Sequence, residues 1–137
     1  MIPYAHLHVH SYYSLLDGQA SIARLVDKAL ADGMRGMALT DHGNMMGVKD
    51  FYNYVNKKKG AAAKEKKAAE AKLTALRKGT YENVPDKNGV NPDAGKTNEE
   101  LIAECEKQIE KAQHVLDFKP IYGCEMYCAR RTKSDKK

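Results

Sequence analysis

The spacing of apolar residues along the first part of the chain predicts a strand, a helix and a second strand. Residues 4–9 form a short β-favouring run with histidines at alternate positions, which we interpret as the first strand. Ser21 offers a helix N-cap and Gly33 a left-handed stop, so a helix of about three turns is expected between them. Its apolar residues recur at helical spacing: Ile22, Leu25, Val26, Ala29 and Leu30. The apolar run 36–40 is typical of a strand buried on both faces of a parallel sheet.

A second helix and a third strand continue this alternation. After the turn at residues 41–44, one helical face carries Val48, Phe51, Tyr52 and Val55. Residues 119–127 read as a third strand, with Pro120 at a position where a strand tolerates proline. The order of the elements favours an α/β fold whose first three strands are parallel and joined by right-handed crossovers.

The segment 58–117 is too long for an ordinary connection between a helix and a strand. Residues 61–78 are rich in Ala, Lys and Glu, which are good helix formers. Thr97 with Glu100 three residues later forms a capping box at the start of another helix. The loop 79–96 between them contains Pro85, Gly89, Pro92 and Gly95. We therefore expect residues 58–117 to form an inserted helical hairpin.

The charge of the chain is concentrated in this insertion. The net charge is +5, but residues 57–78 hold nine Lys and Arg against two Glu, a local +7. The second helix carries five Glu against Lys107 and Lys111 over residues 99–111, a local −3. Two interpretations follow: weak surface pairs between the two helices, which we favour, or a contact of the basic helix with the DNA backbone.

Composition excludes several other classes of protein. The sequence has no apolar run of membrane-spanning length and no secretory signal at its start, which favours the cytoplasm and predicts no membrane partner. The three cysteines have no C-x-x-C spacing, so neither a disulfide framework nor a zinc knuckle is indicated.

Three histidines at alternate positions suggest a metal site. His6, His8 and His10 project to the same side of an extended chain. Such a face would make a poor core and a good metal pocket, and the alternative is a polar surface without metal.

Two further groups stand where the other strands end. His42 follows the second strand and Glu125 closes the third, and the carboxyl ends of parallel strands meet at one edge. Taken singly, His42 is also consistent with a turn cap, and Glu125 with an edge charge or a salt-bridge partner. Asp17, in the loop after the first strand, fits a turn former and a ligand equally well.

Imidazoles mixed with carboxylates suit zinc, manganese or iron better than magnesium or calcium. Ions in such a site activate water and clamp a phosphate, which implies phosphoester hydrolysis. The sequence has no Ser-His-Asp arrangement and no glycine-rich phosphate loop.

These residues lie in motifs that resemble the first motifs of the polymerase and histidinol phosphatase (PHP) domain family. The motifs are HLHVHS at residues 6–11, YSLLDG at 13–18, TDHGN at 40–44 and GCEMY at 123–127. Their wording is most similar to the PHP domains that open bacterial DNA polymerase III alpha subunits. The resemblance implies a distorted β/α barrel with up to three divalent ions, zinc or manganese.

The resemblance also assigns residues. It implies metal ligands at His8, His10, Asp17, His42 and Glu125, and places His6 and Asp41 beside the site. His6 stands where many relatives have Asp. The sequence ends before the later ligands of the family, so we expect a partial PHP domain, residues 1–137, with an open barrel and no nuclease activity by itself.

Three functions follow from the resemblance. The first is the PHP segment of a replicative DNA-directed DNA polymerase, with part of a 3′-5′ exonuclease-type site and DNA as a partner of the parent protein. The second is a non-catalytic scaffold that docks the proofreading exonuclease and other replisome subunits. The third, a free-standing PHP phosphatase, is disfavoured by the polymerase-like motifs.

Overall fold

The computed structural model describes residues 4–83 and 93–129 of the chain, which divide into two compact units. The first unit combines residues 1–57 with 118–137, and the second is Lys58–Asp117. Pro85, Gly89 and Pro92 of the predicted loop lie outside the described residues. None of the helices in the described ranges is long and apolar enough to cross a bilayer.

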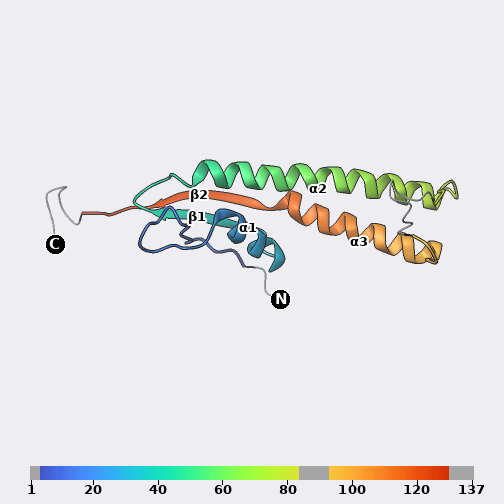
Figure 1. Ribbon diagram of the computed structural model, residues 1–137, viewed down its shortest axis with the longest axis horizontal. Helices are drawn as coiled ribbons and strands as arrows, with labels where there is room; N and C mark the ends of the chain where they lie inside the picture. Colours follow the sequence, from blue (N-terminus) through green and yellow to red (C-terminus); the bar gives the residue numbers. More distant parts are fainter. Residues whose placement is uncertain (1–3, 84–92, 130–137) are drawn as a thin grey trace. The chain divides into compact units, whose positions relative to one another are not determined.

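The first unit is built on a parallel sheet of two strands, β1 (Gly36–His42) and β2 (Lys119–Glu125), which lie side by side in Figure 1. Their register pairs Gly36 with Lys119 at one end and His42 with Glu125 at the other. Gly36 is needed at the first pair, because a Cβ there would lie 2.5 Å from the Lys119 carbonyl oxygen. The predicted α/β class is thus confirmed, with β2 ending two residues earlier than expected.

The predicted first strand is wrong as a regular strand. Residues 4–9 make only one isolated bridge, between His6 and Met37, on the free edge of β1. The Ala38 N–H donates to the His6 carbonyl and the Thr40 N–H to the Val9 carbonyl, each at 2.8 Å. Three residues of the N-terminal segment therefore span two residues of β1, and this extra residue interrupts the ladder as a bulge does.

Helix α1 (Ile22–Ala31) has the caps that the sequence predicts. The Ser21 side chain accepts a hydrogen bond from the Arg24 N–H, and Gly33 adopts a positive φ of 75°. The Met34 N–H reaches back to the Ala29 carbonyl, completing a Schellman motif. Ile22, Val26 and Ala29 form the buried face of this helix.

Helix α2 (Val48–Arg77) begins in the first unit and continues without interruption into the second. Phe51 and Val55 on its first turns are buried with Met37 and Leu39 of β1 in the main core cluster. Phe118, just before β2, completes this core at 1% exposure. The core therefore lies on the face of β1 that carries its odd-numbered residues.

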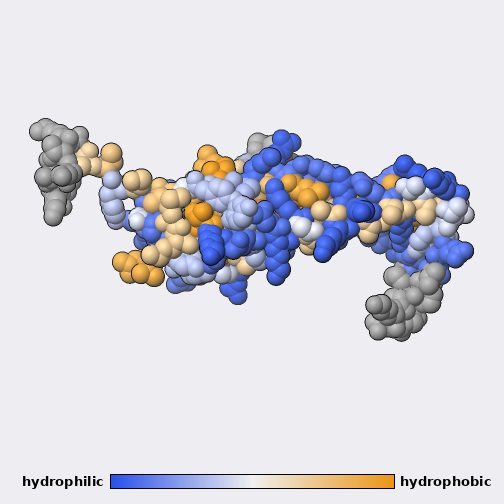
Figure 2. Space-filling view, turned by 90° about the horizontal axis from the view of Figure 1, so that it is seen from above, coloured by the Kyte–Doolittle hydropathy of each residue, from blue (hydrophilic) through white to orange (hydrophobic). Residues whose placement is uncertain are grey.

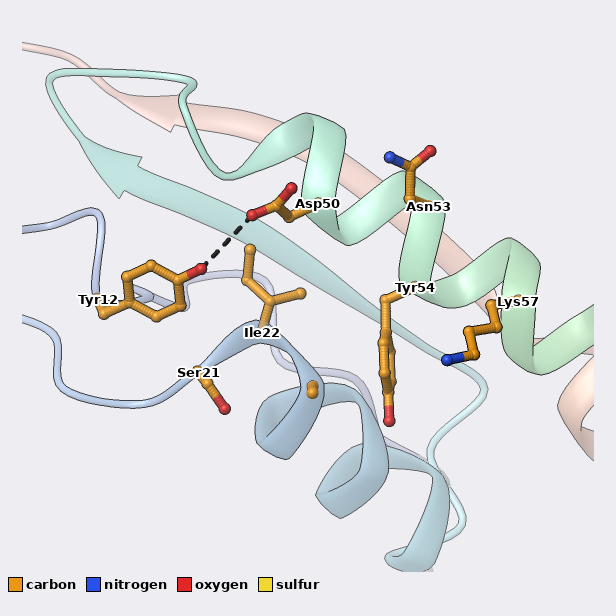
Figure 3. A pocket seen from close by; sticks show the side chains of 8 residues that line it. Tyr12, Ser21, Ile22, Asp50, Asn53, Tyr54 and Lys57 are labelled. Atoms are coloured by element: carbon orange, nitrogen blue, oxygen red, sulfur yellow. Dashed lines mark hydrogen bonds between the residues drawn. The ribbon is translucent and has the colours of Figure 1, made fainter.

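A hollow of about 330 Å³ opens between the start of α1 and the first turns of α2 (Figure 3). Ser21 and Ile22 line it from α1, and Asp50, Asn53 and Lys57 line it from one face of α2. The Tyr12 hydroxyl lies 3.5 Å from Asp50 Oδ2 across this space.

The second unit packs the rest of α2 against α3 (Asn98–Asp117). The predicted capping box is present, since the Thr97 N–H donates to Glu100 at 2.8 Å and the Glu100 N–H to Thr97 Oγ1 at 3.3 Å. Hydrogen bonds that the Glu100 carboxylate accepts from the Thr97 backbone N–H and from the Thr97 side chain hold its pKa below the ordinary value. Leu76 packs with Leu101 and Cys105 in a small core.

Charged contacts in the second unit are of two kinds. Arg77 pairs with Glu106 across the two helices at 2.9 Å, with both side chains more than half exposed, so this pair contributes little to stability. Asp93 is buried and bonds Lys72 Nζ at 2.7 Å and the Tyr81 hydroxyl. Hydrogen bonds from Lys72 and Tyr81 hold the pKa of Asp93 below its ordinary value.

Candidate metal centre

The ends of β1 and β2 bring two predicted ligands together. His42 and Glu125 are the last residues of their strands and are paired in the register. Directly paired residues of parallel strands point to the same face, here the face that carries the even-numbered residues of β1. The Gly43 N–H donates to the Glu125 carbonyl at 2.8 Å and extends this pairing past the strands.

The N-terminal segment supplies two histidines to the same place. His8 Nε2 and His10 Nε2 lie 3.0 Å apart, and His10 Nε2 is 2.7 Å from Glu125 Oε2. His8 Nε2 lies 3.5 Å from the same oxygen. His8, His10 and Glu125 therefore form one group of candidate ligands whose atoms all lie within 4.8 Å of one another.

A second group shares His10. His42 Nδ1 lies 2.5 Å from Asp17 Oδ2, and His10 Nδ1 lies 3.8 Å from the same oxygen. On its other side, His42 Nε2 bonds the Tyr127 hydroxyl. Tyr127 therefore fixes the ring so that Nδ1 faces the cluster. The structure brings His8, His10, Asp17, His42 and Glu125 into one cluster, called the ligand cluster below.

Asp41 is not part of the ligand cluster, but it anchors the segments that carry the ligands. It is 1% exposed on the core face of β1, and its carboxylate accepts hydrogen bonds from the Ser11 N–H at 2.7 Å and from the Ser11 and Ser14 hydroxyls at 2.9 Å. The Ser14 hydroxyl also accepts a hydrogen bond from the His42 N–H at 3.0 Å. This network ties the loop after His10 to the end of β1.

Gly47 makes room for this buried carboxylate. A Cβ at Gly47 would lie 2.5 Å from Asp41 Oδ2 and 3.0 Å from Leu39 Cδ2. Ser11, Ser14 and Tyr127 were missed as functional residues by the sequence analysis. Ser11 and Ser14 lie in the HLHVHS and YSLLDG motifs. A further signal for them is that Asp41 shares its strand face with Met37 and Leu39, so a buried acid there needs hydroxyl or amide donors.

His6 lies outside both ligand groups. Its ring is exposed and meets Tyr4 edge to face, with ring centroids 5.3 Å apart. The bulge beside β1 explains this, because strict alternation from His6 to His10 is lost between the two hydrogen bonds to β1.

The atomic geometry of the ligand cluster suits a cation. Zinc bonded at about 2.0–2.1 Å in tetrahedral geometry has ligand atoms about 3.4 Å apart. The ligand atoms of His8, His10 and Glu125 are separated by 2.7–3.5 Å, which is close to this ligand-to-ligand distance. Glu125 Oε2 is shielded from solvent, and no group within the described residues donates a hydrogen bond of normal geometry to it. The residues present therefore fit a divalent ion that accepts nitrogen and oxygen ligands.

Comparison with known proteins identifies the family. The family model described as the PHP domain matches residues 6–137, nearly the whole chain. The chain belongs to the PHP domain family. PHP domains depend on metal ions, and the ligand cluster is a group of side chains in the described part of this PHP chain that could hold one.

Curated relatives of this PHP chain carry one name. It is 58% identical over 48 residues to "DNA polymerase III subunit alpha" of Treponema pallidum, which is 35% of the chain and 4% of that protein. It is 52% identical over 54 residues to the protein of the same name from Borreliella burgdorferi, 39% of the chain and 5% of the relative. The protein of that name from Helicobacter pylori is 46% identical over 54 residues, 39% of the chain and 4% of the relative.

The matched segments thus span only about a twentieth of the length of these relatives. No solved structure is found to match the chain.

Proposed function

We propose that this chain is the N-terminal PHP segment of a replicative DNA polymerase III alpha subunit, and that its ligand cluster is part of a metal-dependent phosphoesterase site of the 3′-5′ exonuclease type. The convergence of three histidines and two carboxylates at one sheet edge carries the proposal. The matches to alpha subunits from several bacteria support the replicative context.

The larger architecture belongs to the same proposal. Residues 1–137 are a partial PHP domain, β1 and β2 are strands of its distorted β/α barrel, and residues 58–117 are a helical hairpin inserted into it. The parent protein works in the cytoplasm on DNA and binds the proofreading exonuclease and other replisome subunits.

The residues of the cluster divide the work between them. A divalent ion, zinc or manganese, supplies an activated water and neutralises phosphate charge when bound. His8, His10 and Glu125 hold one ion position, while Asp17 and His42 extend the cluster on the other side of His10. Tyr127 orients His42, and Asp41 holds the loop that carries His10 through Ser11.

The proposal assigns no complete active site to this chain. The five residues of the ligand cluster form part of such a site, and binding a metal ion is the property that they can show by themselves. Metal binding is therefore the property that tests the cluster.

The experiment compares two double variants that each remove two of the five histidines. His8→Ala with His10→Ala removes candidate ligands, and His6→Ala with His114→Ala is the matched control. After dialysis against zinc or manganese, elemental analysis should show metal in the wild type and the control, and a loss of most of it in the first variant. Equal metal content in all three proteins would remove the proposed metal site.

A further inference from the structure

A pocket of about 350 Å³ adjoins the ligand cluster. It shares Asp17 and His42 with the cluster, and its remaining wall is largely apolar. Leu15, Leu16, Met46 and Tyr127 form that apolar wall. Its size falls in the usual range for pockets that hold small molecules, about 300–1,000 Å³.

The apolar wall is exposed to solvent, which indicates a binding surface. Leu16 is 99% exposed, Leu15 89% and Met46 70%. Large apolar side chains gathered at a site rim indicate binding more often than scattered ones do. Figure 2 shows one face of the surface, on which small orange areas of strongly apolar residues lie among blue, hydrophilic ones.

The loop that presents the two leucines is anchored. The Ser14 carbonyl accepts hydrogen bonds from the Asp17 and Gly18 N–H groups, both at 2.9 Å. The Ser14 hydroxyl is fixed by the buried Asp41 carboxylate. Gly18 is required at the end of the turn, because a Cβ there would lie 2.1 Å from the Ser11 carbonyl oxygen. The anchored loop therefore presents Leu15 and Leu16 to solvent at a defined position.

The lining of the pocket is of two kinds, which favours a ligand with a charged part and an apolar part. The residues shared with the ligand cluster, His42 and Asp17, offer an imidazole and a carboxylate, which with a bound cation accept a phosphate. Lysine and arginine are absent from the lining in the described part of the chain, so the phosphate depends on the cation for its charge partner. The remaining lining includes leucine and methionine side chains and the Tyr127 ring, which favour a flat apolar group.

We infer that this pocket binds the base of a nucleoside monophosphate unit whose phosphate lies at the ligand cluster. The inference rests on the proposed function and adds to it a substrate class and the residues that select it. Stacking on an aromatic ring tolerates any base, so Tyr127 and the leucines select a nucleotide over a sugar phosphate without selecting a sequence. The unit is either a free nucleotide or the end of a strand.

The test measures binding to the zinc-loaded chain by calorimetry. Deoxyadenosine 5′-monophosphate and deoxyribose 5-phosphate offer the same phosphate, and only the first has a base. We expect the nucleotide to bind about tenfold more tightly or better, because base stacking adds to the shared phosphate contact. A chelator should abolish binding of both ligands.

Matched variants locate the effect. Met46→Ser changes the apolar wall, whereas Met45→Ser changes an exposed neighbour, 53% exposed, that does not line the pocket. Met46→Ser should lower affinity for the nucleotide several-fold and leave the sugar phosphate unchanged. Met45→Ser should alter neither, and a trinucleotide that binds more tightly than the mononucleotide would identify a strand end as the source.

Two results would overturn the inference while leaving the metal site intact. One is equal affinity of the zinc-loaded wild type for the nucleotide and the sugar phosphate. The other is equal loss of nucleotide affinity in Met46→Ser and Met45→Ser. Failure of the wild type to take up zinc would instead remove the proposed function and this inference together.

Discussion

Asp41 shows how one buried side chain sets the position of several exposed ones. Its carboxylate accepts hydrogen bonds from Ser11 and Ser14, and Ser14 in turn binds the His42 N–H. The loop after His10 and the end of β1 are thereby joined at a point that is 1% exposed. The candidate ligands on both sides depend on this buried joint for their spacing.

We predict that Asp41→Asn destabilises the first unit by about 1–3 kcal/mol, because one carboxylate oxygen becomes an amide that faces hydroxyl donors. Amide hydrogen exchange should also speed up at Ser11 and His42, whose N–H groups belong to this network. Asp50→Asn is the control, since Asp50 is exposed and bonds only tyrosine hydroxyls among the contacts described. Unchanged exchange at Ser11 in Asp41→Asn would contradict this account.

At the same scale, sequence patterns predicted some residues of the cluster better than others. His42 and Glu125 could be expected together because both follow a parallel strand, and the register pairs them. Asp17 was equally consistent with a turn and a ligand, and only the folded loop places it 2.5 Å from His42. Tyr127 lies in the GCEMY motif, but the sequence analysis assigned it no role, because its contact with His42 joins residues far apart in sequence.

Helices were predicted more accurately than strands, because their caps are local. Ser21, Gly33 and the Thr97–Glu100 box all act within a few residues of the helix ends that they set. The first strand failed for a non-local reason: its pairing with β1 contains an extra residue, which no pattern within residues 4–9 reveals. The sequence analysis did not predict that the helix after residue 44 continues through Gly60 as the single helix α2.

Replacing Gly60 or Gly79 with alanine should change the stability of the chain in opposite directions. Gly60 is exposed inside α2 and has nothing within 4 Å of an added Cβ, so Gly60→Ala should stabilise the chain by roughly 0.5–1 kcal/mol. Gly79 ends the helix with a φ of 67°, so Gly79→Ala should destabilise it by about 1–2 kcal/mol. Urea unfolding followed by far-UV circular dichroism measures both, and a stabilising Gly79→Ala would refute the assignment of the helix end.

The buried Asp93 makes the second unit sensitive to acid. Its pKa is held below the ordinary value by Lys72 and Tyr81, so its contribution to folding is present above the unfolded-state pKa of about 3.9. That contribution is lost as the pH falls through the lower, folded-state pKa. Asp93→Asn should therefore be less stable than the wild type near neutral pH, and the difference should shrink in acid. Thermal melts across this range check it, and a pH-independent difference would contradict it.

At the scale of the whole molecule, the chain separates a site-bearing unit from a charged helical unit. The ligand cluster and the adjoining pocket belong to the first unit, and the basic residues of α2 lie largely in the second. The cross-helix pair of Arg77 and Glu106 supports the hairpin interpretation of the charges. A DNA contact of the basic segment stays a prediction.

The sheet of the first unit has apolar side chains left at its surface. Ile121 and Met126 are 42% and 79% exposed, and both lie at or just beyond β2. A two-stranded sheet cannot bury both of its faces alone.

The central claim, that the ligand cluster binds a divalent ion, is tested most directly by titrating the chain with zinc while following its five histidine rings by nuclear magnetic resonance. His8, His10 and His42 should shift together and saturate at the same zinc concentration, while His6 and His114 serve as internal controls and stay unchanged. A titration in which the three rings do not respond, or in which all five respond alike, would contradict the account.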